Sequence, residues 1–286
     1  MRLPPHRTRA LLGPVALIVS AVLAACAGTP AEPEGPPRKE TVWAVTDAAE
    51  LLRFNAGQPG KLQQRLPLLG LEAGDKLVGI DFRVARGVLY AVSVRGRLYT
   101  LDTKTGRLTA VGNGPAVVLQ GERFGVDFNP VADRVRVVSD SGQNLRLHPD
   151  TGLLAATDPA LNWGTPGQTA PRVAGAAYTY NKTNDKLTTN YAIDLTAGTL
   201  VTQGSAEGLL PVVSPNTGTL TVVGALGTGA LEDASFDIDD VRNTALAALR
   251  AGGRTRLHLV DLVSGRATLL GTVGDGRALW GMAIEP

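Results

Sequence analysis

Cysteine is almost absent from the sequence, which contains a single one, Cys26, among 286 residues. An intrachain disulfide is therefore excluded, and so is a zinc site built from a cysteine cluster. Histidine is nearly as scarce, because only His148 and His258 follow the first 25 residues, and neither adjoins a nucleophile motif. We interpret both as surface or packing residues, which leaves no histidine for a catalytic triad.

A concentration of positive charge is also missing. The formal net charge is +2, but the arginines at positions 2, 7 and 9 belong to an N-terminal segment that we expect to be removed. Without them, 25 basic and 26 acidic residues remain, and no Lys/Arg cluster is left to bind nucleic acid. The glycine-rich phosphate-binding motifs GxGxxG and GxxxxGK[ST] do not occur in the required context, so nucleotide chemistry is not predicted either.

The N-terminus has the order of a signal peptide, with three arginines followed by an uncharged apolar run at residues 10–25. This run is short for a membrane-spanning helix. It ends in Leu23-Ala24-Ala25-Cys26, which resembles the lipobox of bacterial lipoproteins, where the cysteine thiol receives a diacylglyceryl group. We predict a signal peptide at 1–25 and a lipid anchor on Cys26, which ties the chain to a membrane of the cell envelope, outside the cytoplasm. An ordinary cleaved signal with an incidental cysteine is the alternative.

Residues 27–40 contain four prolines and no large apolar residue, a composition typical of a semi-extended tether. We therefore divide the chain into the signal peptide, the lipidated cysteine with its tether (26–40), and one folded domain (41–286).

Internal repeats fill the folded domain. Residues 79–112 and 125–157 both begin with a Gly-led strand and end with a turn glycine and a fourth strand, and 27 residues separate the two glycines in each repeat. The opening strand recurs three more times, at 175–178, 235–238 and 281–284. The glycine turn recurs at 195–200, 215–220 and 262–267.

Five opening strands predict an all-β fold, a β-propeller of five four-stranded blades. Residues 42–46, 50–54 and 62–69 look like the second, third and fourth strands of a blade, and 281–286 looks like its missing first strand. The C-terminal strand would then close the N-terminal blade and leave no open sheet edge. A β-sandwich is the alternative, but repeats of equal length argue against it.

The string GVDFNPVADRVRVVSDSGQNLRLHPDTG at 125–152, followed by VAGAAYTYN at 173–181, resembles a bacterial family of domains of unknown function, number 4394. The resemblance spans roughly residues 41–286. It implies an exported, repeat-built β domain and implies no reaction and no site.

Three aspartates occupy the third position of an opening strand, Asp81, Asp127 and Asp237, whereas Ala177 and Ala283 stand there in the other two. First strands surround the channel of a propeller, so we expect these carboxylates to converge. They could bind Ca²⁺ or Mg²⁺, the one cofactor that the sequence suggests. Alternatively, each carboxylate accepts backbone N–H groups of a neighbouring blade.

A second group of candidates lies in the loops between blades and between second and third strands, which share one face. Loops on a rigid scaffold often bind ligands, and exposed tryptophans beside amides hold sugars and peptides. The ligand-binding candidates are Arg95, Gln143, Asn144, Asn162, Trp163 and Trp280. Alternatively, the two tryptophans fill the junctions between blades.

Two functions follow from these candidates. The first is a non-enzymatic lipoprotein that binds a protein, peptide or glycan at the cell surface. The second is a metal-dependent hydrolase or lactonase of the propeller type that uses the channel carboxylates. Propeller enzymes of that type surround one cation with Glu, Asn, Asp or His, and only three aspartates match here, so binding is favoured.

The anchor can be tested directly. Because the thiol of Cys26 accepts the lipid, Cys26→Ala should abolish lipid incorporation and leave unprocessed precursor. Labelling cells with a fatty acid measures this, and equal labelling of the variant would contradict the prediction.

Overall fold

A computed structural model describes residues 1, 32, 34–114 and 117–286. Its compact unit runs from Glu32 to Pro286, and the architecture below is that of this unit. Cys26 and the predicted signal peptide, apart from Met1, lie outside the described residues. Within the described part, no helix is long and apolar enough to cross a membrane.

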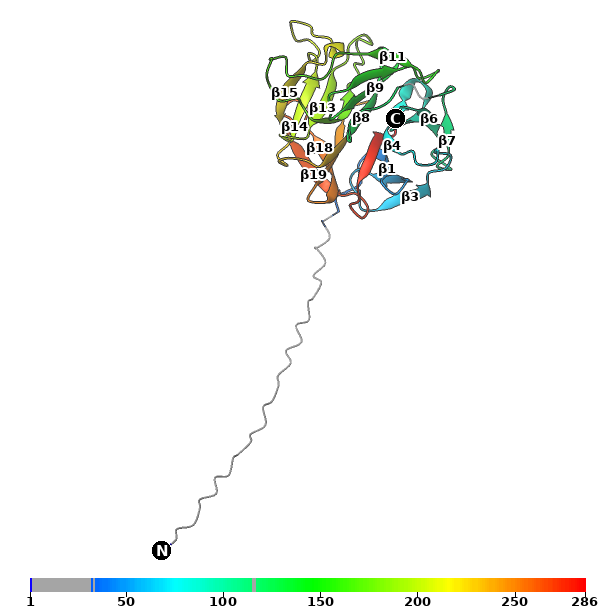
Figure 1. Cartoon of the computed structure of the whole chain (residues 1–286), viewed down its shortest axis with the longest axis vertical. Helices are drawn as coiled ribbons and strands as arrows, with labels where there is room; N and C mark the ends of the chain where they lie inside the picture. The colour runs from blue at the N-terminus through cyan, green and yellow to red at the C-terminus, as the bar shows by residue number, and fades with distance from the viewer. Residues whose placement is uncertain (2–31, 33, 115–116) are drawn as a thin grey trace. The chain divides into compact units, whose positions relative to one another are not determined.

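The described residues form five four-stranded antiparallel sheets, the blades of a β-propeller (Figure 1). Blade 1 contains β20 (Leu279–Ile284), β1 (Thr41–Thr46), β2 (Glu50–Asn55) and β3 (Leu62–Pro67). Blade 2 contains β4 (Leu77–Arg83), β5 (Val88–Ser93), β6 (Leu98–Leu101) and β7 (Leu108–Ala110). Blade 3 contains β8 (Phe124–Asn129), β9 (Arg134–Ser139), β10 (Asn144–Leu147) and β11 (Leu154–Thr157).

Blade 4 contains β12 (Val173–Tyr178), β13 (Asn190–Asp194), β14 (Thr199–Gln203) and β15 (Leu220–Ala225). Blade 5 contains β16 (Asp233–Ile238), β17 (Ala245–Ala251), β18 (Arg254–Val260) and β19 (Ala267–Thr272). Two short 3₁₀ turns, Val84–Arg86 and Pro215–Thr217, complete the regular structure of the described residues.

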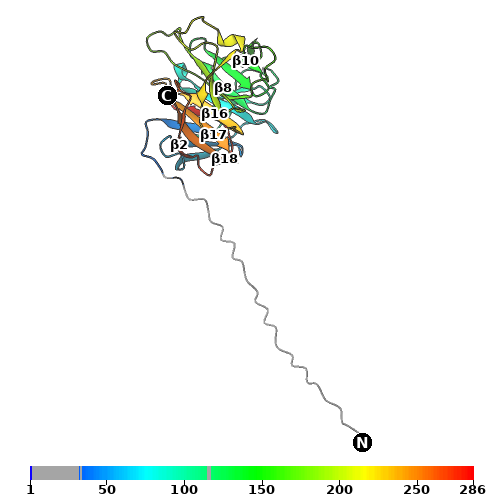
Figure 2. The ribbon, with the colours of Figure 1, turned by 90° about the vertical axis from the view of Figure 1, so that its left-hand side faces the viewer.

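The first strands of the blades, β4, β8, β12, β16 and β20, contact one another in a closed ring. The ring closes because β20 pairs with β1, with Val42 opposite Ile284 and Val45 opposite Gly281. Both predictions, five blades and closure of the first blade by the C-terminal strand, are confirmed. Apolar side chains fill the space between blades: Leu52 and Phe54 of β2 pack with Leu246 of β17, and Figure 2 shows β2 beside blade 5.

Glycine at the start of the first strands lets these strands approach one another at the channel axis. A Cβ atom on Gly79 would lie 2.3 Å from Val126 Cγ2, and one on Gly125 would lie 2.6 Å from the backbone nitrogen of Ala176. A Cβ atom on Gly281 would lie 2.8 Å from the Cα of Gly79. Any side chain at these positions would push the strands apart, which explains why four of the five opening strands begin with glycine.

One predicted turn equivalence is wrong. Gly106, Gly152 and Gly265 lie between the third and fourth strands of their blades, but Gly198 lies between β13 and β14, the second and third. In blade 4 the equivalent connection is 204–219, which contains Gly218. The same left-handed glycine closes a tight hairpin whichever strands it joins, so the local sequence does not distinguish the two.

The compact unit begins before residue 41, because part of the predicted tether lies against blades 1 and 5. Glu32 forms an ion pair with Arg256, and Glu34 forms one with Lys61, both at 2.5–2.6 Å. The side chain of Asn55 accepts the backbone N–H of Arg38 at 2.8 Å. Glu32, Glu34 and Arg38 of the predicted tether therefore contact the propeller.

Deletion of residues 281–286 should lower the melting temperature and cause aggregation or proteolysis, because it removes most of β20 and exposes the edge of β1. Thermal unfolding of the full chain and of the deletion variant measures this. Removal of Pro286 alone, outside β20, is the control and should leave the melting temperature unchanged. Equal melting of the six-residue deletion would contradict the closure.

Candidate functional site

The channel has two mouths, which differ in size. At the N-terminal mouth, where the five first strands begin, the pocket measures about 30 Å³. At the level of the glycines that begin the first strands, which we call the glycine layer, the free space in the channel is about 10 Å³. At the C-terminal mouth, where the first strands end, a pocket of about 660 Å³ opens. Only this last space is large enough for an organic ligand.

Three buried carboxylates form the floor of the large pocket. Asp81, Asp127 and Asp237 each follow the glycine layer by two residues, so their side chains point to the axis like the glycines. One oxygen of each lies within 4.8 Å of an oxygen of the others. The carboxylates therefore converge at the axis.

Two of these aspartates each accept two backbone N–H groups. Asp81 accepts the N–H of Phe82 and that of Phe128 in the next blade, both at 2.7 Å. Asp237 accepts the N–H of Ile238 at 2.6 Å and that of Ile284 in the next blade at 2.5 Å. Both link their own first strand to the following one, which is the second of the two roles considered above.

Asp127 differs, because it accepts only the N–H of Tyr178 in the next blade, at 2.5 Å. Together, the three carboxylates therefore accept one backbone N–H from each of the five first strands. Ala177 and Ala283 have no carboxylate to accept the N–H of the next blade. In these two places the N–H is accepted by the aspartate of its own strand, through that aspartate's second oxygen. Of the six oxygens, Asp127 Oδ1 accepts no backbone N–H of the described residues, but the side chain of Asp127 shares a hydrogen bond with that of Asp81.

Burial and mutual repulsion raise the pKa of these acids. Loss of hydration raises the pKa of Asp81 and Asp127 well above the usual range, and the charge of Asp237 raises both further. The hydrogen bond between the two carboxyl groups raises the pKa of Asp127 and opposes the rise at Asp81. Burial also raises the pKa of Asp237 to about 6. Burial together with the charge of Asp237 raises the pKa of Asp240, beside the pocket, to about 7. The floor of the pocket therefore holds protons that exposed aspartates would release.

The pocket supplies no cation to balance these acids. Among the described residues, none of the three ring aspartates and no oxygen of Asp240 lies in an ion pair. Arg83, which lines the pocket, instead contacts Asp133 and Asp150, each at 2.5 Å. Lys182 lies at the pocket wall and is exposed.

The candidate loop residues lie at the other end of the channel or at blade junctions. Trp163 is half-buried, packs on Val138, Leu161 and Val173, and donates its indole N–H to the carbonyl of Thr169 at 3.1 Å. The side chain of Asn162 forms two hydrogen bonds within the same loop, both at 2.9 Å. This placement fits the interpretation in which Trp163 fills a blade junction.

Trp280 lines the small N-terminal pocket, where Lys76 Nζ lies 5.6 Å from the ring centroid. Arg95 is exposed and contacts Glu72 at 3.5 Å. The side chain of Gln143 accepts the N–H of Gln120 and donates to the carbonyl of Val118. These residues lie at separate junctions, and the structure does not bring them together into one pocket.

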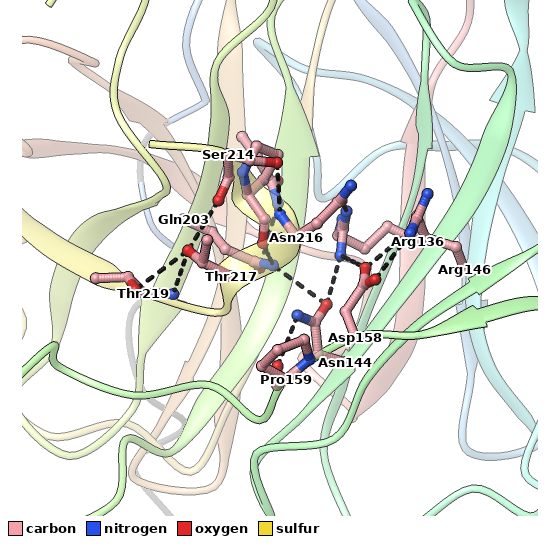
Figure 3. A network of polar contacts seen from close by, with 12 residues as sticks. Arg136, Asn144, Arg146, Asp158, Pro159, Gln203, Ser214, Asn216, Thr217 and Thr219 are labelled. Atoms are coloured by element: carbon pink, nitrogen blue, oxygen red, sulfur yellow. Dashed lines mark hydrogen bonds and ion pairs between the residues drawn. The ribbon is translucent and has the colours of Figure 1, made fainter. Parts of the chain in front are cut away.

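Asn144 belongs to a buried polar network between blades 3 and 4 (Figure 3). At its centre is Arg136, which is 1% exposed and donates to Asn144, Asp158 and Asn216 at 2.5–3.2 Å. Arg136 is not among the residues predicted from the sequence, although a charged residue inside the apolar strand RVRVV is a usable signal. Since every partner of its guanidinium belongs to the protein, we assign this network to blade packing.

Alanine substitutions in the aspartate ring should lower stability in a defined order. Asp81→Ala and Asp237→Ala each leave two buried N–H groups unpaired, at about 1–3 kcal/mol for each group. Asp127→Ala leaves one and also relieves repulsion, so its loss should be the smallest. Urea unfolding of the full chain at pH 7 measures the three losses. The largest loss for Asp127→Ala, or three equal losses, would contradict the pairing.

Comparison with known proteins identifies a family for this chain. No curated protein matches it. A crystal structure of a structural genomics protein of unknown function from Bacteroides thetaiotaomicron VPI-5482 is 11% identical, with a TM-score of 0.47 over 82% of this chain and 58% of that one. Dihydro-heme d1 dehydrogenase NirN in complex with DHE is 14% identical, with a TM-score of 0.37 over 83% and 45%. The chain spans about half the length of these two structures. Residues 50–283 match the family described as Domain of unknown function (DUF4394), so the chain belongs to this family, as the string at 125–152 predicted.

Proposed function

We propose that this chain is a lipid-anchored protein of the cell envelope that binds a protein, peptide or glycan without catalysing a reaction. Its binding site would be the pocket at the C-terminal mouth of the channel. The observation that carries this proposal is the pocket itself, about 660 Å³ in volume, beside a channel that is otherwise closed.

Exposed apolar side chains around the pocket support binding. Val84, Val131, Tyr180 and Val241 are 38–46% exposed and line the pocket. Each comes from the loop that follows the first strand of a different blade, in blades 2 to 5. We call these four residues the apolar rim. Several exposed apolar side chains around one cavity are typical of a binding site.

The hydrogen bonds of the aspartate ring favour binding over the metal-dependent alternative. Ca²⁺ takes six to eight oxygen ligands, and Mg²⁺ takes six in a strict octahedron. Five of the six ring oxygens already accept a backbone N–H, and the pocket lining contains no histidine and no glutamate. A metal ion would have to compete with the contacts that hold the first strands together.

The predicted anchor also agrees with a role at the membrane surface. Five residues lie between Cys26 and Glu32, the first residue of the compact unit, so the two are at most about 20 Å apart along an extended chain. A lipid on Cys26 would therefore hold the propeller close to the bilayer.

The proposal can be tested by capture of a partner from the native envelope with the full chain in detergent. Val131→Arg places a long charged side chain at the apolar rim and should abolish capture. Val263→Arg is the matched control, because Val263 is 90% exposed in the turn between β18 and β19 and does not line the pocket. Capture that is equal for all three proteins would exclude the pocket as the binding site.

A further inference from the structure

A groove of about 730 Å³ lies between the tether and blade 5. Its lining comes mainly from three segments: the tether at Arg38, the loop between β16 and β17 at 242–244, and the turn between β18 and β19 at 261–266. The groove is distinct from the pocket at the channel mouth, because the two share no lining residue.

The lining of this groove has an excess of positive charge. Three of its residues are arginines, Arg38, Arg242 and Arg266, and one, Asp261, is an acid. Arg242 and Arg266 are exposed, and neither side chain forms an ion pair or a hydrogen bond with the described residues. Arg38 contacts Glu40 through its Nε at 2.9 Å, and its Nη atoms have no partner in the described part of the chain.

The acid of the lining is already engaged. Asp261 accepts the N–H groups of Val263 and Ser264 and the hydroxyl of Ser264, all at 2.8–3.0 Å. These bonds stabilise its own turn, so Asp261 does not neutralise the two unpaired arginines through direct contact. An anion that enters the groove therefore meets guanidinium donors that have no other partner.

Hydrogen bonds also hold the other two walls of the groove. Asn55 accepts the backbone N–H of Arg38 and donates to the carbonyl of Arg38, both at 2.8 Å. Asn243 and Tyr180 exchange two hydrogen bonds, at 2.8 and 3.0 Å, which tie the 242–244 loop to blade 4. Because the backbone of each wall is ordered in advance, a ligand has less conformational entropy to overcome.

The position of the groove on the tether determines which anion it meets. Five residues lie between the predicted anchor at Cys26 and Glu32, and Arg38 follows in the same tether. A bilayer that holds the lipid is therefore close to the groove, and its surface carries phosphate groups. Guanidinium groups bind phosphate oxygens with paired, charge-assisted hydrogen bonds.

From this arrangement we infer that the groove between the tether and blade 5 binds the phosphate of an anionic phospholipid headgroup. The inference rests on the proposed function, because it requires the lipid anchor to hold the chain at a bilayer. Arg242 and Arg266 donate to the phosphate oxygens, and the Nη atoms of Arg38 donate from the tether. Contact at this site sets how the propeller lies on the membrane and leaves the pocket at the channel mouth available to a partner.

Hydrogen exchange of the full chain in vesicles tests the contact independently of the anchor. One set of vesicles contains phosphatidylcholine alone, and the other a three-to-one mixture of phosphatidylcholine and phosphatidylglycerol. The anchor is the same in both, and only the headgroup charge differs. Backbone N–H groups at 242–244 and 262–266 should exchange more slowly in the mixture, and concentrated salt should remove the difference because it screens the charges.

Variants locate the bound headgroup. The double variant Arg242→Gln, Arg266→Gln keeps long polar side chains but removes both unpaired charges, and should lose the protection that phosphatidylglycerol gives. Lys104→Gln, Lys186→Gln is the matched control, because it removes two exposed charges that do not line the groove, and should keep the protection. Thermal unfolding of both variants shows that the fold is kept.

Three results would overturn the inference. Phosphatidylglycerol could leave exchange in the two segments unchanged, or it could slow exchange equally in the arginine variant. Inorganic phosphate added to neutral vesicles could give the same protection, which would assign the groove to a soluble anion. In each case capture by the wild type but not by Val131→Arg still supports the proposed function. Loss of the chain from neutral vesicles in concentrated salt would instead contradict the anchor.

Discussion

The close approach of the five first strands at the axis is the constraint on which the rest of this structure depends. Each first strand pairs with its own blade along one edge, and its other edge faces the channel. With glycine at positions such as 79, 125 and 281, these edges come so close that water is largely excluded. The N–H groups just beyond the glycine layer are then buried and need acceptors. The side chain of an aspartate one residue earlier reaches both its own strand and the next, so three carboxylates can serve five strands.

The same carboxylates give the pocket its chemistry. A ring of five aspartates would have supplied ten oxygens for five N–H groups and would have crowded five charges together. Alanine at 177 and 283 reduces the ring to six oxygens, one more than the strands use. The remaining oxygen belongs to Asp127, whose neighbours in the ring raise its pKa further. Because Asp127 also shares a hydrogen bond with Asp81, the carboxyl groups that hold the strand edges are linked to one another at the floor of the pocket.

The fold could be read from the sequence because it depends on repetition. Five matching opening strands, four of them led by glycine, and a C-terminal segment that matches the strand missing from the first blade predict the blades and their closure. The third position of those strands predicts the convergence of the aspartates. Other features depend on contacts between distant residues. The role of Asp81 depends on the alanine at 283 and on the N–H of Phe128, and the burial of Arg136 depends on Asp158, Tyr178 and Asn216. The glycine turn at 198 was misassigned because its local chemistry is the same in any tight hairpin.

The sequence could not show which mouth of the channel holds the pocket, and the reason lies in what the two sets of loops must do. Loops at the N-terminal mouth cross from one blade to the next, so their side chains are used to join blades, as Trp163 does on Val138 and Arg123 does on Asp233 at 3.2 Å. Loops at the C-terminal mouth connect two strands of one blade and need not touch a neighbour. Their apolar residues, such as Val131 and Val241, therefore stay exposed around the aspartate floor. In this chain the aromatic residue Trp163 of a connecting loop therefore packs at a blade junction, whereas the apolar residues of the loops after the first strands are exposed around the pocket.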